Sequence, residues 1–122
     1  MFVLIVETDR DLGNLWKRHL ERNGCRVILA CDQETAFGAL RTLPINVIVL
    51  NLVLADGYAF AVADFAAYRR PEAKVIFVTN TTFFSDGSIF RHTANAAAFL
   101  PSDTAPDDLC AVVEHHSPTK AA

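Results

Sequence analysis

The residues of this sequence that could take part in chemistry stand directly after short apolar runs. Glu7 and Asp9 follow the run MFVLIV, and carboxylates of this kind can hold a cation. Thr79 follows VIFV, where a hydroxyl could bind an oxyanion or satisfy a backbone group. Asn51 follows NVIVL, and its carboxamide has neither charge nor nucleophilicity. The sequence therefore indicates a polar site in which one central position is chemically inert.

Five apolar runs predict the strands that position these residues. Near-continuous apolar runs, without strict alternation, are typical of strands buried on both faces. The segments between them have helical spacing. The runs are FVLIV (2–6), RVILA (26–30), VIVL (47–50), VIFV (75–78) and AAFL (97–100).

The first helix has the clearest pattern. Its apolar face is formed at helical spacing by Leu12, Leu15, Trp16, His19 and Leu20. We expect His19 to be a packed, hydrogen-bonded histidine. Further helices are predicted at about Gln33–Arg41, Tyr58–Arg69, Phe84–His92 and Pro106–His115.

The ends of the first helix also have local signals. Thr8, with Asp11 three residues later, predicts an N-cap, and Asp9 and Asp11 would favour the positive end of the helix dipole. Asp9 could also lean into the site as a substitute ligand. Asn23 and Gly24 predict a left-handed stop at the other end.

Alternating strands and helices predict an α/β fold with a doubly wound parallel sheet, right-handed crossovers and helices on both faces, that is, three layers. We expect one domain over residues 1–116 and a loose tail over 117–122. Ligands of such sheets gather beyond the carboxyl ends of the strands. The polar residues predicted there are Glu7, Thr8, Asp9, Asn51, Thr79, Asn80, Ser102 and Asp103.

The charge and the length of the apolar runs make some classes of binding partner unlikely. The 122 residues carry a net charge of -3, which offers no broad basic surface for nucleic acid or anionic lipid. The MFVLIV run is too short for a signal peptide or a membrane span, so we expect a cytoplasmic protein. Cys25, Cys31 and Cys110 are expected to be free thiols, since Cys25 and Cys31 would lie about 20 Å apart along one strand.

Four motifs in order carry a resemblance to a known family. The motifs LIVETDRDL, VIVLNLVLADG, VIFVTN and AAFLPSD are spaced as in the receiver domain of bacterial response regulators, which the chain resembles over residues 1 to 115. The resemblance implies a flavodoxin-like, five-stranded parallel sheet of order 2-1-3-4-5. It also implies a role in two-component signal transduction.

In that family, as the resemblance implies, an acidic pair after the first strand holds Mg²⁺ and an aspartate after the third strand receives a phosphoryl group from a histidine kinase. A hydroxyl after the fourth strand and a lysine after the fifth contact the phosphoryl oxygens, and an aromatic on the fifth strand changes orientation. Glu7, Thr79 and Phe99 keep the first acid, the hydroxyl and the aromatic.

Three other positions depart from the family pattern. Thr8 replaces the second acid, Asn51 replaces the phosphoacceptor aspartate and Ser102 replaces the lysine. A carboxamide cannot form an acyl phosphate, and one remaining carboxylate is a poor set of ligands for Mg²⁺. The three replacements compensate one another. With Thr8 and Asn51 neutral, there are fewer carboxylates to repel one another, so neither a metal ion nor a lysine at position 102 is needed to offset that repulsion. Asn51 could equally be a strand-end residue whose amide bonds a loop.

These observations favour a receiver-like module that is not an enzyme, needs no cofactor or metal, binds Mg²⁺ weakly or not at all, and acts by protein–protein interaction without phosphorylation. Its partner would be a histidine kinase, another regulator or a second copy of itself, through the fourth helix, fifth strand and fifth helix. Phe83, Phe84 and Phe90 are candidate interface residues there. Two alternatives are a phosphoacceptor receiver with an engineered aspartate-to-asparagine change and a small-ligand sensor for a flavin or nucleotide.

Overall fold

The computed structural model describes residues 1–52, 54, 59–79 and 95–116, and every structural statement below concerns these residues. They form an alternating series of strands and helices. The elements are β1 (Phe2–Val6), α1 (Arg10–Arg22), β2 (Arg26–Ala30), α2 (Gln33–Thr42), β3 (Val47–Asn51), α3 (Ala59–Arg69), β4 (Lys74–Thr79), β5 (Ala96–Pro101) and α5 (Pro106–His115).

The strands form one parallel sheet of order β2-β1-β3-β4-β5. This arrangement confirms the predicted doubly wound α/β fold and its strand order. The register places Val6 beside Ala30 and Leu50, and Thr79 beside Pro101. The carboxyl ends of the strands therefore meet along one edge of the sheet, where the candidate site was predicted.

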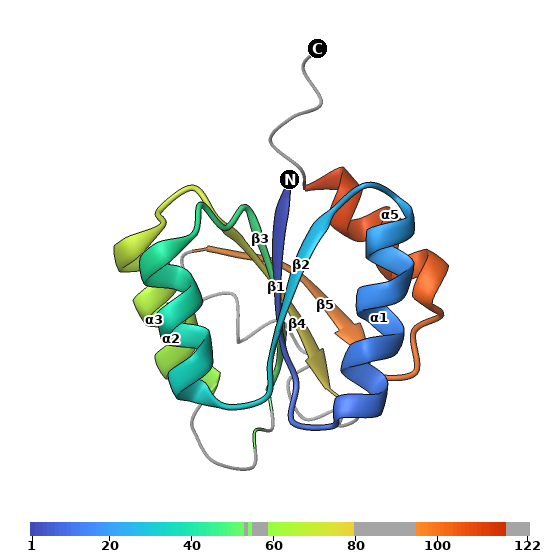
Figure 1. The fold of residues 1–122 in the computed structure, drawn as a ribbon, viewed down its shortest axis with the longest axis horizontal. Coiled ribbons are helices and arrows are strands. Elements are labelled where there is room, and N and C mark those ends of the chain that lie inside the picture. Colours follow the sequence, from blue (N-terminus) through green and yellow to red (C-terminus); the bar gives the residue numbers. More distant parts are fainter. Residues whose placement is uncertain (53, 55–58, 80–94, 117–122) are drawn as a thin grey trace.

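Each face of the sheet has its own apolar core. Leu4, Ile48 and Phe77 point to the face covered by α2 and α3, and they are fully buried there. Alternate residues such as Ile5 and Val49 point to the opposite face, which α1 and α5 cover (Figure 1). Because successive strand residues face opposite sides, a continuous apolar run supplies both cores at once.

The predicted boundaries are close to those observed. The helix predicted at Pro106–His115 has those bounds, and the one predicted at Gln33–Arg41 extends one residue further, to Thr42. Asn51 and Thr79 are the last residues of their strands, not residues that follow them. The helix predicted at Phe84–His92 lies outside the described residues.

The prediction that Thr8 caps α1 is wrong. Asp9 is the N-cap, and its Oδ1 accepts hydrogen bonds from the backbone N–H groups of Asp11 and Leu12 at 3.0 and 3.2 Å. The helix begins one residue later than the Thr8 spacing suggests, and aspartate caps at least as well as threonine. The stop at the other end is confirmed, because Gly24 has a φ of 88°.

Candidate functional site

Glu7 lies at the carboxyl end of β1 and is almost fully buried, with 2% of its surface exposed. Its backbone N–H donates to the carbonyl of Ala30 at 3.0 Å, which extends the pairing of β1 with β2 by one residue. A buried carboxylate is costly unless hydrogen-bond donors surround it. The groups that donate to Glu7 therefore determine what this end of the sheet can do.

Asn51 provides one of these donors. Its Nδ2 donates to Oε1 of Glu7 at 2.7 Å, across the junction of β3 and β1. The short distance is typical of a hydrogen bond to a charged acceptor, which is stronger than a bond between neutral groups. Asn51 is therefore the neutral partner of the buried acid, a pairing that sequence reasoning missed because the two residues are 44 positions apart.

The turn between β1 and α1 supplies a second donor. The backbone N–H of Asp9 donates to Oε2 of Glu7 at 3.1 Å, so both carboxylate oxygens accept a hydrogen bond from the protein. The Asp9 side chain is directed to the first turn of α1, where it is the N-cap, and it is exposed to solvent. Thr8 lies between these two acids and is partly exposed.

Thr79 and Ser102 meet at the ends of β4 and β5. Thr79 is buried, with 1% of its surface exposed, and its carbonyl accepts a hydrogen bond from the backbone N–H of Ser102 at 2.9 Å. The structure thus brings the predicted hydroxyl position and the predicted lysine replacement together through the backbone. Ser102 is partly exposed and stands where a long cationic side chain was expected from the family pattern.

Phe99 lies on β5 beside Phe77 of β4. It is partly buried and packs against the core under α2 and α3. This placement agrees with its assignment as the aromatic of the fifth strand. The other predicted aromatics, Phe83, Phe84 and Phe90, lie outside the described residues.

The described residues at this edge offer few of the ligands that a Mg²⁺ ion prefers. Such an ion prefers near-octahedral coordination by oxygen ligands, usually including more than one carboxylate or phosphate. Glu7 already accepts bonds from Asn51 and from the Asp9 backbone, and an amide N–H is aimed at the carboxylate where a cation would approach. Among the described residues, no group of three His, Cys, Asp or Glu side chains could hold a metal.

Comparison with known proteins places this geometry in context. No family model and no curated protein matches the sequence. Solved structures do match, among them a response regulator receiver domain (CheY-like) from Methanospirillum hungatei JF-1, with a TM-score of 0.85 and 23% identity over 93% of this chain and 90% of that one. The non-phosphorylated HemR receiver domain from Leptospira biflexa matches with a TM-score of 0.83 and 25% identity, over 94% and 92% of the two chains.

This chain has the receiver-domain fold of response regulators. A third match is a response regulator from Burkholderia pseudomallei, whose structure contains a phosphorylated aspartic acid, a calcium ion and citrate. Its TM-score is 0.81 at 16% identity, and the alignment covers 91% of this chain and 65% of that one. The likeness extends over nearly the whole receiver fold although the sequences have diverged widely.

Proposed function

We propose that this chain is a receiver-like module of two-component signalling that acts by protein–protein interaction and does not depend on aspartyl phosphorylation. The observation that carries the proposal is the hydrogen bond from Asn51 Nδ2 to Glu7 Oε1 at 2.7 Å. The amide takes the place at the end of β3 where the family pattern requires a nucleophilic carboxylate. An amide nitrogen bonded to an acid cannot serve as a phosphoryl acceptor.

The surroundings of Asn51 support the same conclusion. A phosphoryl group needs cationic or N–H donors around it, and Ser102 brings no charge to this edge. Glu7 has its own protein donors and so does not require a bound cation to offset its charge. The charge of Glu7 at this end of the sheet is therefore offset by hydrogen bonds from the protein, without metal or phosphate. By contrast, the Burkholderia pseudomallei protein contains a phosphorylated aspartic acid, and a DrrB receiver has been activated with BeF3.

The partner in this proposal is a protein: a histidine kinase, another regulator or a second copy of the chain. Of the three elements proposed for such contacts, β5 and α5 belong to the described residues, and the predicted fourth helix lies outside them. No helix of the described residues is long and apolar enough to cross a membrane. A cytoplasmic location belongs to the proposal, and the free state of Cys25, Cys31 and Cys110 agrees with a reducing compartment.

The test is an amide-resolved NMR titration of the purified chain with Mg²⁺ and then with beryllofluoride, which mimics a phosphoryl group on aspartate. We expect the resonances of Glu7, Asn51 and Thr79 to stay unchanged, because position 51 has no acceptor carboxylate and both carboxylate oxygens of Glu7 already accept hydrogen bonds from the protein. Saturable shifts at these residues that spread to Phe99 would overturn the proposal.

The matched control is Asn51→Asp, which restores a carboxylate at the end of β3. If this variant responds to Mg²⁺ and beryllofluoride while the natural sequence does not, Asn51 alone blocks the chemistry. If both are silent, the neutral residues Thr8 and Ser102 contribute to the block, as expected for a coordinated loss of charge.

A further inference from the structure

The helices α2 and α3 pack against each other on one face of the sheet, and their contact has a defined register (Figure 1). Phe37 of α2 and Phe65 of α3 meet edge to face, with their ring centroids 5.1 Å apart. One turn later on each helix, Arg69 Nη2 of α3 donates to the carbonyl of Arg41 of α2 at 3.0 Å. The contact between the two helices is therefore apolar in its middle and basic at their carboxyl-terminal ends.

A second arginine binds the same end of α2. Arg70 directly follows α3, and its Nε donates to the carbonyl of Leu40 at 3.1 Å. The last carbonyl groups of a helix have no partner within the helix, and a cation near them also favours the negative end of the helix dipole. Because Leu40 and Arg41 are consecutive, these two bonds hold the guanidinium groups of Arg69 and Arg70 next to each other.

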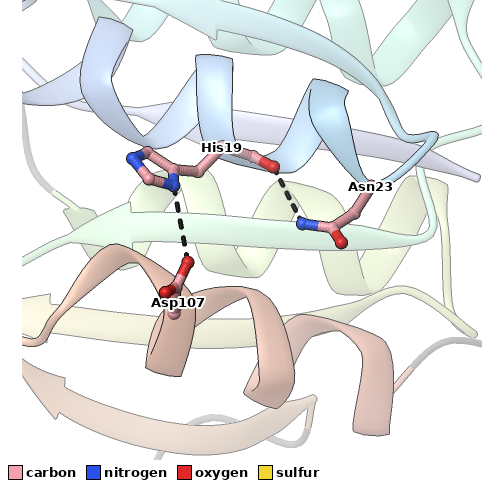
Figure 2. A network of polar contacts seen from close by, with 3 residues as sticks. All are labelled: His19, Asn23 and Asp107. Atoms are coloured by element: carbon pink, nitrogen blue, oxygen red, sulfur yellow. Dashed lines mark hydrogen bonds and ion pairs between the residues drawn. The ribbon is translucent and has the colours of Figure 1, made fainter.

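The helix pair on the opposite face of the sheet, α1 and α5, has different chemistry. Asn23 Nδ2 donates to the carbonyl of His19 at 2.9 Å, so α1 ends on a cap of its own (Figure 2). His19 Nδ1 lies 3.6 Å from Asp107 Oδ1 of α5. His19 is about three-quarters buried, in agreement with the packed histidine predicted, whereas the Asp107 side chain is almost fully exposed. Within the described residues, arginines bound to the end of a neighbouring helix thus occur in the α2–α3 pair and not in this one.

The two bound arginines keep most of their hydrogen-bonding capacity. A guanidinium group has five N–H donors, and each of the bonds to α2 uses one of them. Arg69 and Arg41 are exposed, and Arg70 is partly exposed. Glu72 follows two residues after Arg70, but among the described residues no carboxylate forms an ion pair with any of the three arginines. One end of a chain whose net charge is -3 therefore carries three positive charges close together.

An exposed aromatic side chain adjoins these charges. Tyr68 precedes Arg69 in α3, and 82% of its surface is exposed. No other large hydrophobic side chain of the described residues is exposed. Tyrosine and arginine are the residue types that protein–protein interfaces favour, and they often contribute most of the binding energy there. The composition of this surface is therefore that of an interface.

We propose that Arg41, Tyr68, Arg69 and Arg70, here called the arginine face, bind an acidic segment of a partner protein. A carboxylate can accept two parallel hydrogen bonds from one guanidinium group. The bonds to α2 already hold two of these groups in place, which lowers the entropy cost of binding. An acidic peptide segment fits this small surface better than nucleic acid, because a chain of net charge -3 repels a long polyanion.

The arginine face lies away from the polar edge of the sheet. The carboxyl-terminal ends of α2 and α3 lead into β3 and β4, so they lie near the amino ends of the strands, whereas Glu7 and Asn51 lie at the carboxyl ends. Binding at the arginine face adds a second surface to the proposed function and is independent of the chemistry at position 51. Its test needs neither Mg²⁺ nor beryllofluoride, so it can fail without affecting the proposed function.

The test measures the binding of a fluorescein-labelled oligoglutamate peptide to the full chain by fluorescence anisotropy. We expect saturable binding that weakens as sodium chloride is raised, because salt screens exposed charges. An oligoglutamine peptide should not bind. The triple variant Arg41→Gln, Arg69→Gln and Arg70→Gln should bind the acidic peptide roughly tenfold more weakly, since each exposed ion pair contributes a modest amount.

The matched control replaces three exposed arginines of α1, on the other face of the sheet, in the variant Arg10→Gln, Arg18→Gln and Arg22→Gln. Its net charge changes by the same amount as that of the triple variant, but we expect its affinity to fall by less than about twofold. Equal losses in the two variants would contradict the proposal, because binding would then follow net charge alone.

A second variant separates binding from folding, since Arg69 and Arg70 also hold the end of α2. Arg41→Gln combined with Tyr68→Ala changes two exposed side chains and keeps both arginine bonds to α2. We expect an unchanged melting temperature and roughly threefold weaker binding of the acidic peptide. Full affinity in this variant, no saturable binding to the natural sequence, or tighter binding of an oligouridylate of equal charge would each overturn the proposal.

Discussion

At the scale of single residues, two asparagines show how an amide acts when its partner is present or absent. Asn46 precedes β3, and its Oδ1 accepts the backbone N–H of Phe2 at 2.9 Å. Asn95 precedes β5 and is 7% exposed, and among the residues that the structure describes neither of its side-chain polar atoms has a hydrogen-bond partner. Burying an amide without a hydrogen-bond partner lowers the stability of the folded state, because its hydrogen bonds to water are lost. A partner in the protein compensates for that loss.

We therefore expect Asn95→Leu to raise the free energy of unfolding by about 1 kcal/mol, because it removes an unsatisfied polar group at similar volume. Asn46→Leu is the control and should lower it by about 1 kcal/mol, since the Phe2 N–H loses its acceptor. Urea denaturation followed by Trp16 fluorescence measures both. A loss of stability in Asn95→Leu would show that this amide is paired in solution.

The Glu7–Asn51 pair makes a second prediction at this scale. Asn51→Asp would place two carboxylates at about the 2.7 Å now spanned by the hydrogen bond. Without a cation we expect the free energy of unfolding to fall by about 1 to 3 kcal/mol at pH 7, because the hydrogen bond is lost and two adjacent carboxylates repel each other.

Exchanging the two groups in the double variant Glu7→Gln with Asn51→Asp restores an amide–carboxylate pair and should recover much of the stability. Urea titrations of the natural sequence, the two single variants and the double variant at pH 7 measure the cycle. An additive double variant would show that the two side chains do not interact, contrary to the hydrogen bond in the structure.

At the scale of elements, two glycines should respond to alanine in opposite directions. Gly24 directly follows Asn23, the C-cap of α1, and has a φ of 88°, a conformation that a Cβ makes unfavourable, although no atom would contact that Cβ within 4 Å. Gly38 lies inside α2, where an added Cβ also meets no atom within 4 Å. The difference between the two sites is therefore backbone conformation alone.

Gly24→Ala should lower the free energy of unfolding by about 1 kcal/mol. Gly38→Ala should raise it by about 0.5 to 1 kcal/mol, because alanine is the better helix former and restricts the unfolded chain. Thermal unfolding followed by circular dichroism distinguishes them. Equal effects of the two substitutions would contradict the assigned role of Gly24 as the left-handed stop.

At the scale of the whole molecule, the two cores share the strands between them. Ile5 of β1 and Ile48 of β3 are both fully buried, but Ile5 faces α1 and α5 whereas Ile48 faces α2 and α3. Trp16 of α1 belongs to the same core as Ile5. Because a single sheet supports both layers, loss of either core should unfold the other.

We expect Ile5→Val and Ile48→Val each to lower the free energy of unfolding by about 0.5 to 1.5 kcal/mol. In both variants Trp16 fluorescence and helical circular dichroism should report one transition midpoint, as in a two-state domain. If Ile48→Val moved the circular dichroism midpoint but left the fluorescence midpoint unchanged, the two layers would unfold separately.

The sequence by itself determined the fold class and the place of the site. Short, near-continuous apolar runs that alternate with helical segments are typical of a parallel sheet covered on both faces. The polar residues at the ends of such strands meet at one edge, as Glu7, Asn51, Thr79 and Ser102 do. Only the tertiary structure decided which groups are partners. The bond between Asn51 and Glu7 joins residues 44 positions apart, and the amide of Asn95 is buried without a hydrogen-bond partner among the described residues. Local sequence patterns cannot predict contacts between residues that are far apart in the chain. Even locally, the choice between Thr8 and Asp9 as the N-cap of α1 differed by one residue, which is within the usual error of a predicted helix start.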